Sequence, residues 1–389
     1  MITVYLDSQD YSTLSSSRIE PAQEQIRERL REWSRSGAVR FVFSAFIVSE
    51  AAPTGPHAND FAIARGELLS NLCGENALLE GWLLLQEEAR HLSSANDSPL
   101  SPLSPTGDFF PEIGFDDPPS LEQSVLETAP NRAQRRKSFK NGVVRPQFRE
   151  QLRKLLSQTY VEQVVTKYPM KLEYADTFAR FALGETSREE ASAALRASIR
   201  DPRWLMSWFA ANPELAKPIM EMVRKPGREM GLKARELIQY RDSFQSDPQT
   251  RNMPSAVWND TAELKNMWVS HTSATVEYVA KRFCVHSDSL WPEHATAEGI
   301  AKYCPGLNAM VRSMLDSVWD SFGGGRKVEP TDSQFPDAMH AIYAPYVDVF
   351  RADRFMAPHI RRQLEGSRTT VVSLLAELPA VIERRLADR

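Results

Sequence analysis

Cysteine is scarce in this chain of 389 residues. Its three cysteines, Cys73, Cys284 and Cys304, are widely spaced, and no two of them form a CxxC pair. An odd number of distant thiols argues against a disulfide framework and against a zinc–thiolate site. The first residues match a strand pattern and not a basic segment followed by an apolar run, so we expect no secretion signal. These features predict a reduced, cytoplasmic protein.

Long hydrophobic runs and net positive charge are also missing. The longest apolar stretch lies near residues 41–48 and is too short and too interrupted to span a bilayer, so we expect no membrane association. The formal net charge is −4, which gives no overall basic field for nucleic acid, although an acidic catalytic cleft would itself add negative charge. The glycine run at 323–325 lacks the Lys-Ser/Thr of a P-loop, and no HExxH, nucleophile elbow or dinucleotide fingerprint occurs.

What the chain does contain is acids placed directly after predicted strands. Residues 2–6 form a short apolar strand pattern that Asp7 follows at once. Residues 347–350 form another strand pattern, and Asp353 comes where the chain leaves it. In an open α/β sheet, ligands bind in the crevice at the carboxyl ends of the strands. Both acids are therefore expected to face such a crevice.

Two predicted short helices carry further acids. A third strand over 39–43 leads through Ser44, a favourable N-cap residue, into a helix that carries Glu50. Asp337 is expected to cap the start of another short helix, which Pro345 should end after about two turns. In both parts of the chain, the predicted strand–helix units therefore carry acids at similar positions, after a strand or on the neighbouring short helix.

These carboxylates together favour a site for a hard divalent cation. Four carboxylates in one crevice repel one another unless cations neutralise them, and oxygen ligands of this kind suit Mg²⁺ or Mn²⁺ rather than zinc. The candidate ligands of such a cation are Asp7, Glu50, Asp337 and Asp353. Each also has a structural interpretation: Asp7 and Asp337 as helix caps, and Glu50 as an exposed helix acid. Candidates for supporting contacts to the ligands, to water or to phosphate are Asp10, Asp332, His340, Ser8 and Ser44.

The order strand-Asp7, helix-Glu50, Asp337-Ala-Met-His-Ala and Val-Phe-Arg-Ala-Asp353 resembles the PIN-domain nucleases. The resemblance covers about residues 1–90 and 326–389. It implies a parallel sheet flanked by helices, an acidic quartet formed by the same four residues, and metal-dependent cleavage of RNA, less often of DNA. Two features depart from the family pattern. More than two hundred residues separate Glu50 from Asp337, and Arg351-Ala352 replaces the small hydroxyl-and-Asn pair that often precedes the last acid.

We therefore expect an α/β fold of PIN-like type that is interrupted by a mostly α-helical insertion. The predicted segments are 1–90 and 323–389 as the two parts of the PIN-like domain, 91–131 as a Pro/Ser-rich acidic linker, and 132–322 as the helical insertion. Helical patterns recur over 147–320, with an expected break at Pro226-Gly227.

Basic residues gather just after the linker. This run is either a solvated helix face that pairs with the acidic linker or an arm that contacts nucleic-acid phosphates. Its members are Arg132, Arg135, Arg136, Lys137 and Lys140. A second basic run, Arg224-Lys-Pro-Gly-Arg228 with Lys233 and Arg235, is interpreted as surface.

The function predicted from these features is that of a Mg²⁺- or Mn²⁺-dependent endoribonuclease, with RNA favoured over DNA as substrate. One alternative is a non-catalytic PIN-like binding module whose insertion docks a protein partner. Another is a defence nuclease held inactive until a regulatory partner or signal moves the insertion. A homodimer is also a candidate state, because compact members of the family often pair.

Overall fold

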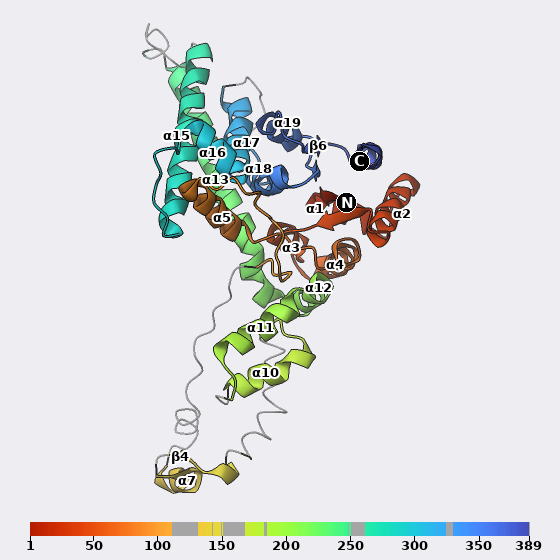
Figure 1. Cartoon of the computed structure of the whole chain (residues 1–389), viewed down its shortest axis with the longest axis vertical. Coiled ribbons are helices and arrows are strands. Elements are labelled where there is room, and N and C mark those ends of the chain that lie inside the picture. Colours follow the sequence, from red (N-terminus) through yellow and green to blue (C-terminus); the bar gives the residue numbers. More distant parts are fainter. Residues whose placement is uncertain are drawn as a thin grey trace. The chain divides into compact units, whose positions relative to one another are not determined.

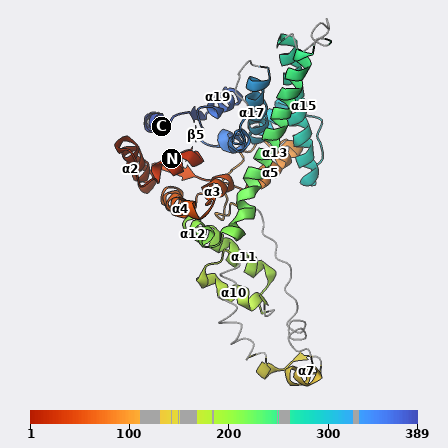
Figure 2. The ribbon, with the colours of Figure 1, turned by 180° about the vertical axis from the view of Figure 1, so that it is seen from behind.

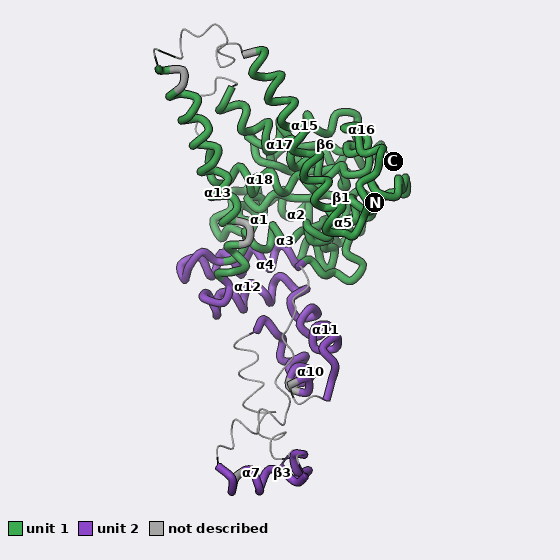
Figure 3. Tube along the Cα trace, turned by 90° about the vertical axis from the view of Figure 1, so that its left-hand side faces the viewer, with its two compact units in different colours: residues 1–52, 71–109, 217–389 green, residues 53–70, 110–216 purple. Residues whose placement is uncertain are grey.

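The computed structural model describes residues 1–110, 131–150 without 142 and 149, 168–182, 185–247 with 249, 261–323 and 330–388. The chain divides into two compact units, shown in green and purple in Figure 3. The first unit comprises residues 1–52, 71–109 and 217–389, and the second comprises residues 53–70 and 110–216. The expected insertion contributes residues 132–216 to the second unit and 217–322 to the first. The domain bounds expected from the sequence stay a prediction.

A four-stranded parallel sheet lies at the centre of the first unit, in the order β2-β1-β5-β6 (Figure 1). The strands are β1 Ile2–Tyr5, β2 Val39–Val42, β5 Val349–Arg351 and β6 Thr370–Val372. In the register of the sheet, Tyr5 pairs with Val42 on one side and with Phe350 on the other. The carboxyl ends of three neighbouring strands therefore meet at one edge. The predicted α/β fold with a parallel sheet flanked by helices is confirmed.

Helices pack on the sheet and leave its strands almost wholly buried. Helices α2 (Pro21–Arg35) and α20 (Leu378–Ala387) pack on each other and on the strands. Helix α19 (Met356–Gln363) packs on β6 and on α17 (Pro305–Phe322), and Figures 1 and 2 show this pair on the side away from α2. Parallel strands covered in this way are mostly apolar, as β1 and β6 are.

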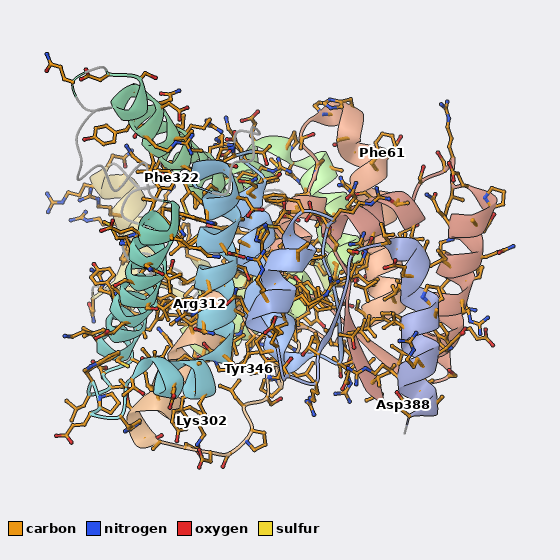
Figure 4. The ribbon with its side chains drawn as sticks, turned by 90° about the horizontal axis from the view of Figure 1, so that it is seen from above. Phe61, Lys302, Arg312, Phe322, Tyr346 and Asp388 are labelled. Atoms are coloured by element: carbon orange, nitrogen blue, oxygen red, sulfur yellow. The ribbon has the colours of Figure 1, made fainter. Side chains whose placement is uncertain are left out.

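The first unit has further helices, of which α5, α15, α16 and α18 pack on α17. Arg312 and Phe322, labelled in Figure 4, lie along α17; Arg312 Nη2 donates to Ser273 Oγ over 3.3 Å, and Phe322 stacks on Trp268. Both partners belong to α15, so side chains along α17 tie these two long helices together. The helices are α1 Ser8–Leu14, α3 Ala45–Ala51, α5 Gly81–Ser94, α13 Pro213–Ser246, α15 Thr261–His286, α16 Ala297–Tyr303 and α18 Gln334–His340, with 3-10 segments at Ala341–Tyr346 and Leu375–Glu377.

The described part of the second unit is largely helical. Asp201 caps its helix α12 by accepting from the Arg203 N–H over 3.0 Å, and Lys171 Nζ lies 3.0 Å from the same carboxylate. Residues 111–130 of the expected linker lie outside the described residues. The elements are a 3-10 turn at Pro56–Ala58, α4 Asn59–Cys73, α7 Arg132–Ser138, an antiparallel pair of β3 Phe139–Lys140 and β4 Val143–Val144, α10 Leu172–Ala182, α11 Arg188–Ile199 and α12 Pro202–Ala211.

The expected bounds of the Asp337 helix are wrong at both ends. Helix α18 begins at Gln334, so Asp337 lies in its first turn and is not its N-cap. Pro336 is tolerated there because the first N–H groups of a helix have no intrahelical acceptor. After His340 the chain continues as a 3-10 segment that contains Pro345. The tighter 3-10 turn accepts this proline because it uses other hydrogen bonds than the α-helix, in which the ring would collide with an earlier carbonyl.

The cysteines and the apolar character of the helices are the next features of the fold. All three cysteines are free thiols and buried. Within the part of the chain that the structure describes, no helix combines the length and the apolar character that crossing a bilayer requires.

Glu88 on α5 is a fully buried acid that caps α17. Its carboxylate accepts from the N–H of Gly306 over 2.6 Å and of Leu307 over 3.0 Å, and Tyr346 also donates to it. Burial raises the pKa of Glu88 to about 7, against the opposing effect of these hydrogen bonds. The free N–H groups and the positive end of the α17 dipole explain why an acid is retained in this core.

We expect Glu88 to make folding pH-dependent. Because its pKa is higher in the folded than in the unfolded chain, its contribution to stability is complete below pH 4.5 and is lost as pH rises through about 7. The loss should be on the order of 3 kcal/mol, since the pKa rises from 4.5 to about 7 and one pKa unit is worth about 1.4 kcal/mol. Urea unfolding between pH 4.5 and 8 should show a steeper fall in wild type than in Glu88→Gln. Equal slopes in the two proteins would contradict this expectation.

Candidate active site

Two of the predicted ligands leave the sheet at the same edge. Asp7 follows β1 and Asp353 follows β5, and these strands are parallel neighbours. Asp7 Oδ1 accepts from the Gln9 N–H over 2.8 Å and so caps α1, while Asp353 Oδ1 accepts from the Met356 N–H over 2.6 Å at the start of α19. The capping role weighed for Asp7 is therefore present. Each cap uses one carboxylate oxygen and orients the other.

Glu50 and His340 form the end of a chain of polar contacts. His340 Nε2 lies 3.3 Å from Glu50 Oε1, its Nδ1 lies 2.6 Å from the Tyr5 hydroxyl, and that hydroxyl lies 2.8 Å from Ser44 Oγ. Burial works against charge on both groups, yet their mutual attraction outweighs it: the pKa of Glu50 is lowered and that of His340 is raised. The contact between the two side chains therefore favours a charged imidazole beside an ionised carboxylate.

Asp337 is influenced electrostatically by the other three acids. It is partly buried on α18, one turn before His340. Burial raises the pKa of Asp337 to about 8, and the charges of Glu50, Asp7 and Asp353 add to the rise while His340 opposes it. The pKa of Asp7 is also raised, first by burial, with Glu50 contributing and Gln9, His340 and Arg351 opposing. Four acids from four separate elements therefore act on one another, and a cation would relieve the excess negative charge.

Glu50 and Asp337 line a cavity of about 400 Å³. Two arginines from α13 form part of its wall, although the sequence pattern indicated a surface run. A recognisable signal was the spacing of these arginines by one helical turn, with Gly227 between them as the first residue of a Gly-x-x-x-Gly pattern that ends at Gly231. The full lining is Ser8, Glu50, Arg224, Arg228, Asp332, Ser333, Pro336 and Asp337.

The two acids predicted as supporting groups are held by arginines. Asp10 is fully buried, and its carboxylate lies 3.1 Å from Arg351; burial raises the pKa of Asp10 to about 7, against the attraction of that arginine. Within the described residues, Nε and Nη1 of the buried Arg351 have no hydrogen-bond acceptor. Asp332 pairs with Arg235 over 3.0 Å. The residue that departs from the family pattern thus compensates a buried acid next to the cluster.

The donor set fits a hard divalent cation in its chemistry. Four carboxylates offer the oxygen donors that such an ion prefers. The pKa of Asp7 and of Asp337 is raised first by burial and then by the charges of neighbouring acids. In the described part of the chain, no three His, Cys, Asp or Glu side chains are arranged as a ready-made metal cage. The roles of the four acids as metal ligands stay a prediction.

The predicted phosphate-contacting arm lies in the second unit. Its five basic residues are exposed, four of them on α7 and one on β3, and their contact with nucleic acid stays a prediction. They are Arg132, Arg135, Arg136, Lys137 and Lys140.

Comparison of the chain with protein-family models, with curated proteins and with solved structures finds no match. The resemblance to PIN-domain nucleases therefore stays a prediction.

Proposed function

We propose that this chain is a metal-dependent nuclease that hydrolyses phosphodiester bonds, with RNA favoured over DNA. The proposal depends on one observation: Asp7, Glu50, Asp337 and Asp353 come from four separate elements and act on one another electrostatically at one edge of a parallel sheet. Such an arrangement costs stability unless a cation is bound, so a purely structural role explains it poorly. The preference for RNA is supported by the family resemblance alone.

These four acids would hold Mg²⁺ or Mn²⁺, which supplies a bound water of lowered pKa and polarises the scissile phosphate. The chain's own groups keep the acids in place. The helix N–H groups of Gln9 and Met356 orient Asp7 and Asp353. His340 holds Glu50, and Tyr5 fixes the imidazole ring in turn. Side chains oriented in this way need little rearrangement to bind a cation.

The test is the response of the chelator-treated protein to Mn²⁺ and to Mg²⁺. At a hundredfold excess of metal over Kd, binding to the folded state alone should add about 2.7 kcal/mol to the free energy of unfolding and raise Tm. Asp7→Asn should lose this rise, because asparagine still caps α1 but removes the charge. The same samples should then cleave RNA or single-stranded DNA in a metal-dependent way. An unchanged Tm in wild type would favour the non-catalytic binding module, and a metal response without cleavage would favour a nuclease regulated by a partner.

A further inference from the structure

We propose that Arg224 and Arg228 on α13 bind a backbone phosphate of a single-stranded nucleic acid beside the acidic cluster. The inference rests on the proposed function and names the part of the site that holds the substrate. The two arginines are one turn apart on a helix, so they share a face. They line the same cavity as Glu50 and Asp337. A cavity with acids on one wall and arginines on another matches a phosphodiester whose metal-facing and solvent-facing oxygens need different partners.

Close packing holds α13 against the segment that carries Asp337. A Cβ atom added at Gly227 would lie 2.8 Å from Pro336 Cδ and 2.9 Å from the Asp332 carbonyl oxygen. No side chain fits there, so the backbone of α13 approaches the start of α18 directly. Further along α13, Arg235 Nη1 donates to the Pro330 carbonyl over 3.0 Å and pairs with Asp332. These contacts fix the position of α13, and so of its two arginines, relative to the acid on α18.

The two guanidinium groups differ in how many of their N–H donors are free to bind a phosphate. Within the described residues, Arg224 makes no hydrogen bond or ion pair. Burial raises the pKa of Glu50, and the charge of Arg224 lowers it by less than His340 and Ser8 do. Arg228 pairs with Glu221 through Nη2. A guanidinium group offers five N–H donors in a planar fork, so one engaged nitrogen leaves an edge that can bind phosphate oxygens.

A simple counter-ion role is the competing explanation. If the arginines only neutralise Glu50 and its neighbours, their removal should change metal affinity and stability but not the binding of a nucleic-acid backbone. Phosphate contacts have a separate signature. Each contact to a single strand contributes about 0.7 to the slope of log K against log salt concentration, because bound counterions are released.

The experiment measures binding of a fluorescent single-stranded RNA oligonucleotide to the full chain by anisotropy. It is done in EDTA and in Ca²⁺ over a range of salt concentrations. The variants are Arg224→Gln, Arg228→Gln and the double variant. Lys233→Gln is the matched control, since Lys233 is on the same helix, pairs with Glu236 and is not among the cavity-lining residues. We expect the salt slope to fall by roughly 0.7 in each single variant and by roughly 1.4 in the double variant. Kd at moderate salt should rise about tenfold per arginine, and Lys233→Gln should leave both values unchanged.

An unchanged slope in the double variant, or no oligonucleotide binding by wild type, would overturn the inference. Failure of the inference and failure of the proposed function give different patterns. If wild type responds to metal and cleaves, and the arginine variants keep its KM and salt slope, the proposed nuclease function is retained and the proposed phosphate contact is rejected. If wild type shows no metal response but the double variant still lowers the salt slope, the phosphate site is retained and the nuclease function is rejected.

Discussion

Replacing Asp337 by asparagine is expected to stabilise the metal-free protein and to abolish metal-dependent cleavage. The folded-state pKa of Asp337 is raised to about 8, so its ionisation costs stability as pH rises from 3.8 through 8. Asparagine has a similar shape without the charge, and at pH 8 it removes that cost. With saturating Mn²⁺ the order should reverse, because wild type gains binding free energy that the variant lacks. Loss of about 4 kcal/mol of transition-state stabilisation would lower cleavage about a thousandfold.

The measurement is Tm in EDTA and in Mn²⁺ at pH 8, followed by cleavage rates on the same samples. Asp332→Asn is the matched control, because Asp332 lines the same cavity but is paired with Arg235. This control should lack the reversal and should keep its metal response. If Asp337→Asn lowers Tm in EDTA as well as in Mn²⁺, the acid is a structural group and the cluster is not a cation site. A thousandfold loss without the reversal would place Asp337 in catalysis but not in metal binding.

The acids at strand ends were predictable because the information is local. Short apolar runs, each followed by an acid, correspond to β1 and β5, and parallel neighbours necessarily end at the same edge. Ser44 was predicted as a helix cap, and it precedes α3 as expected. Its hydroxyl contacts Tyr5 and makes no side-chain cap bond. That difference depends on Tyr5 being buried beside it, which the residues around Ser44 do not reveal.

The contribution of α13 could not be predicted from local signals. Pro226-Gly227 is a strong break signal, because proline inside a helix costs about 3 kcal/mol and glycine about 1 kcal/mol relative to alanine. The helix nevertheless runs from Pro213 to Ser246 through both residues. Long-range packing against Pro336 and Asp332 explains how this segment is held, and that packing requires a glycine. The same packing turns a basic run that was interpreted as surface into a wall of the cavity.

Arg351 shows the same limit of sequence reasoning. From the sequence, Arg351 could be described only as a residue that replaces part of the hydroxyl-and-Asn pair of the family pattern. In the fold it is buried on β5 and paired with Asp10, which is itself buried after β1. Two groups that are far apart in sequence and costly to bury alone thus compensate each other. Neither residue could be assigned this partner before the two strands were known to be neighbours.

The two glycines of α13 offer the sharpest test of how the helix positions the site. Helix propensity alone predicts that alanine at either position stabilises the protein by about 1 kcal/mol. At Gly227 the new Cβ would meet the Pro336 ring of α18 at 2.8 Å and the backbone carbonyl of Asp332, just before that helix, at 2.9 Å. Neither is the end of a flexible side chain. Forcing them apart should cost about 1–3 kcal/mol, so Gly227→Ala should lower Tm and, by displacing Asp337, the cleavage rate.

At Gly231 the nearest atom is Asp332 Oδ1 at 2.9 Å, followed by Arg235 Nη1 at 3.4 Å. Both are ends of flexible side chains that can move, so Gly231→Ala should be close to neutral in Tm and should keep its cleavage rate. Thermal unfolding and cleavage rates of the two variants, measured side by side, test whether α13 is anchored at Gly227. Equal effects would mean that α13 follows its intrinsic propensity and is not anchored at Gly227. A loss confined to Gly227→Ala would show that the direct approach of α13 to Pro336 is what keeps the arginine-bearing helix and the acid-bearing helix in register.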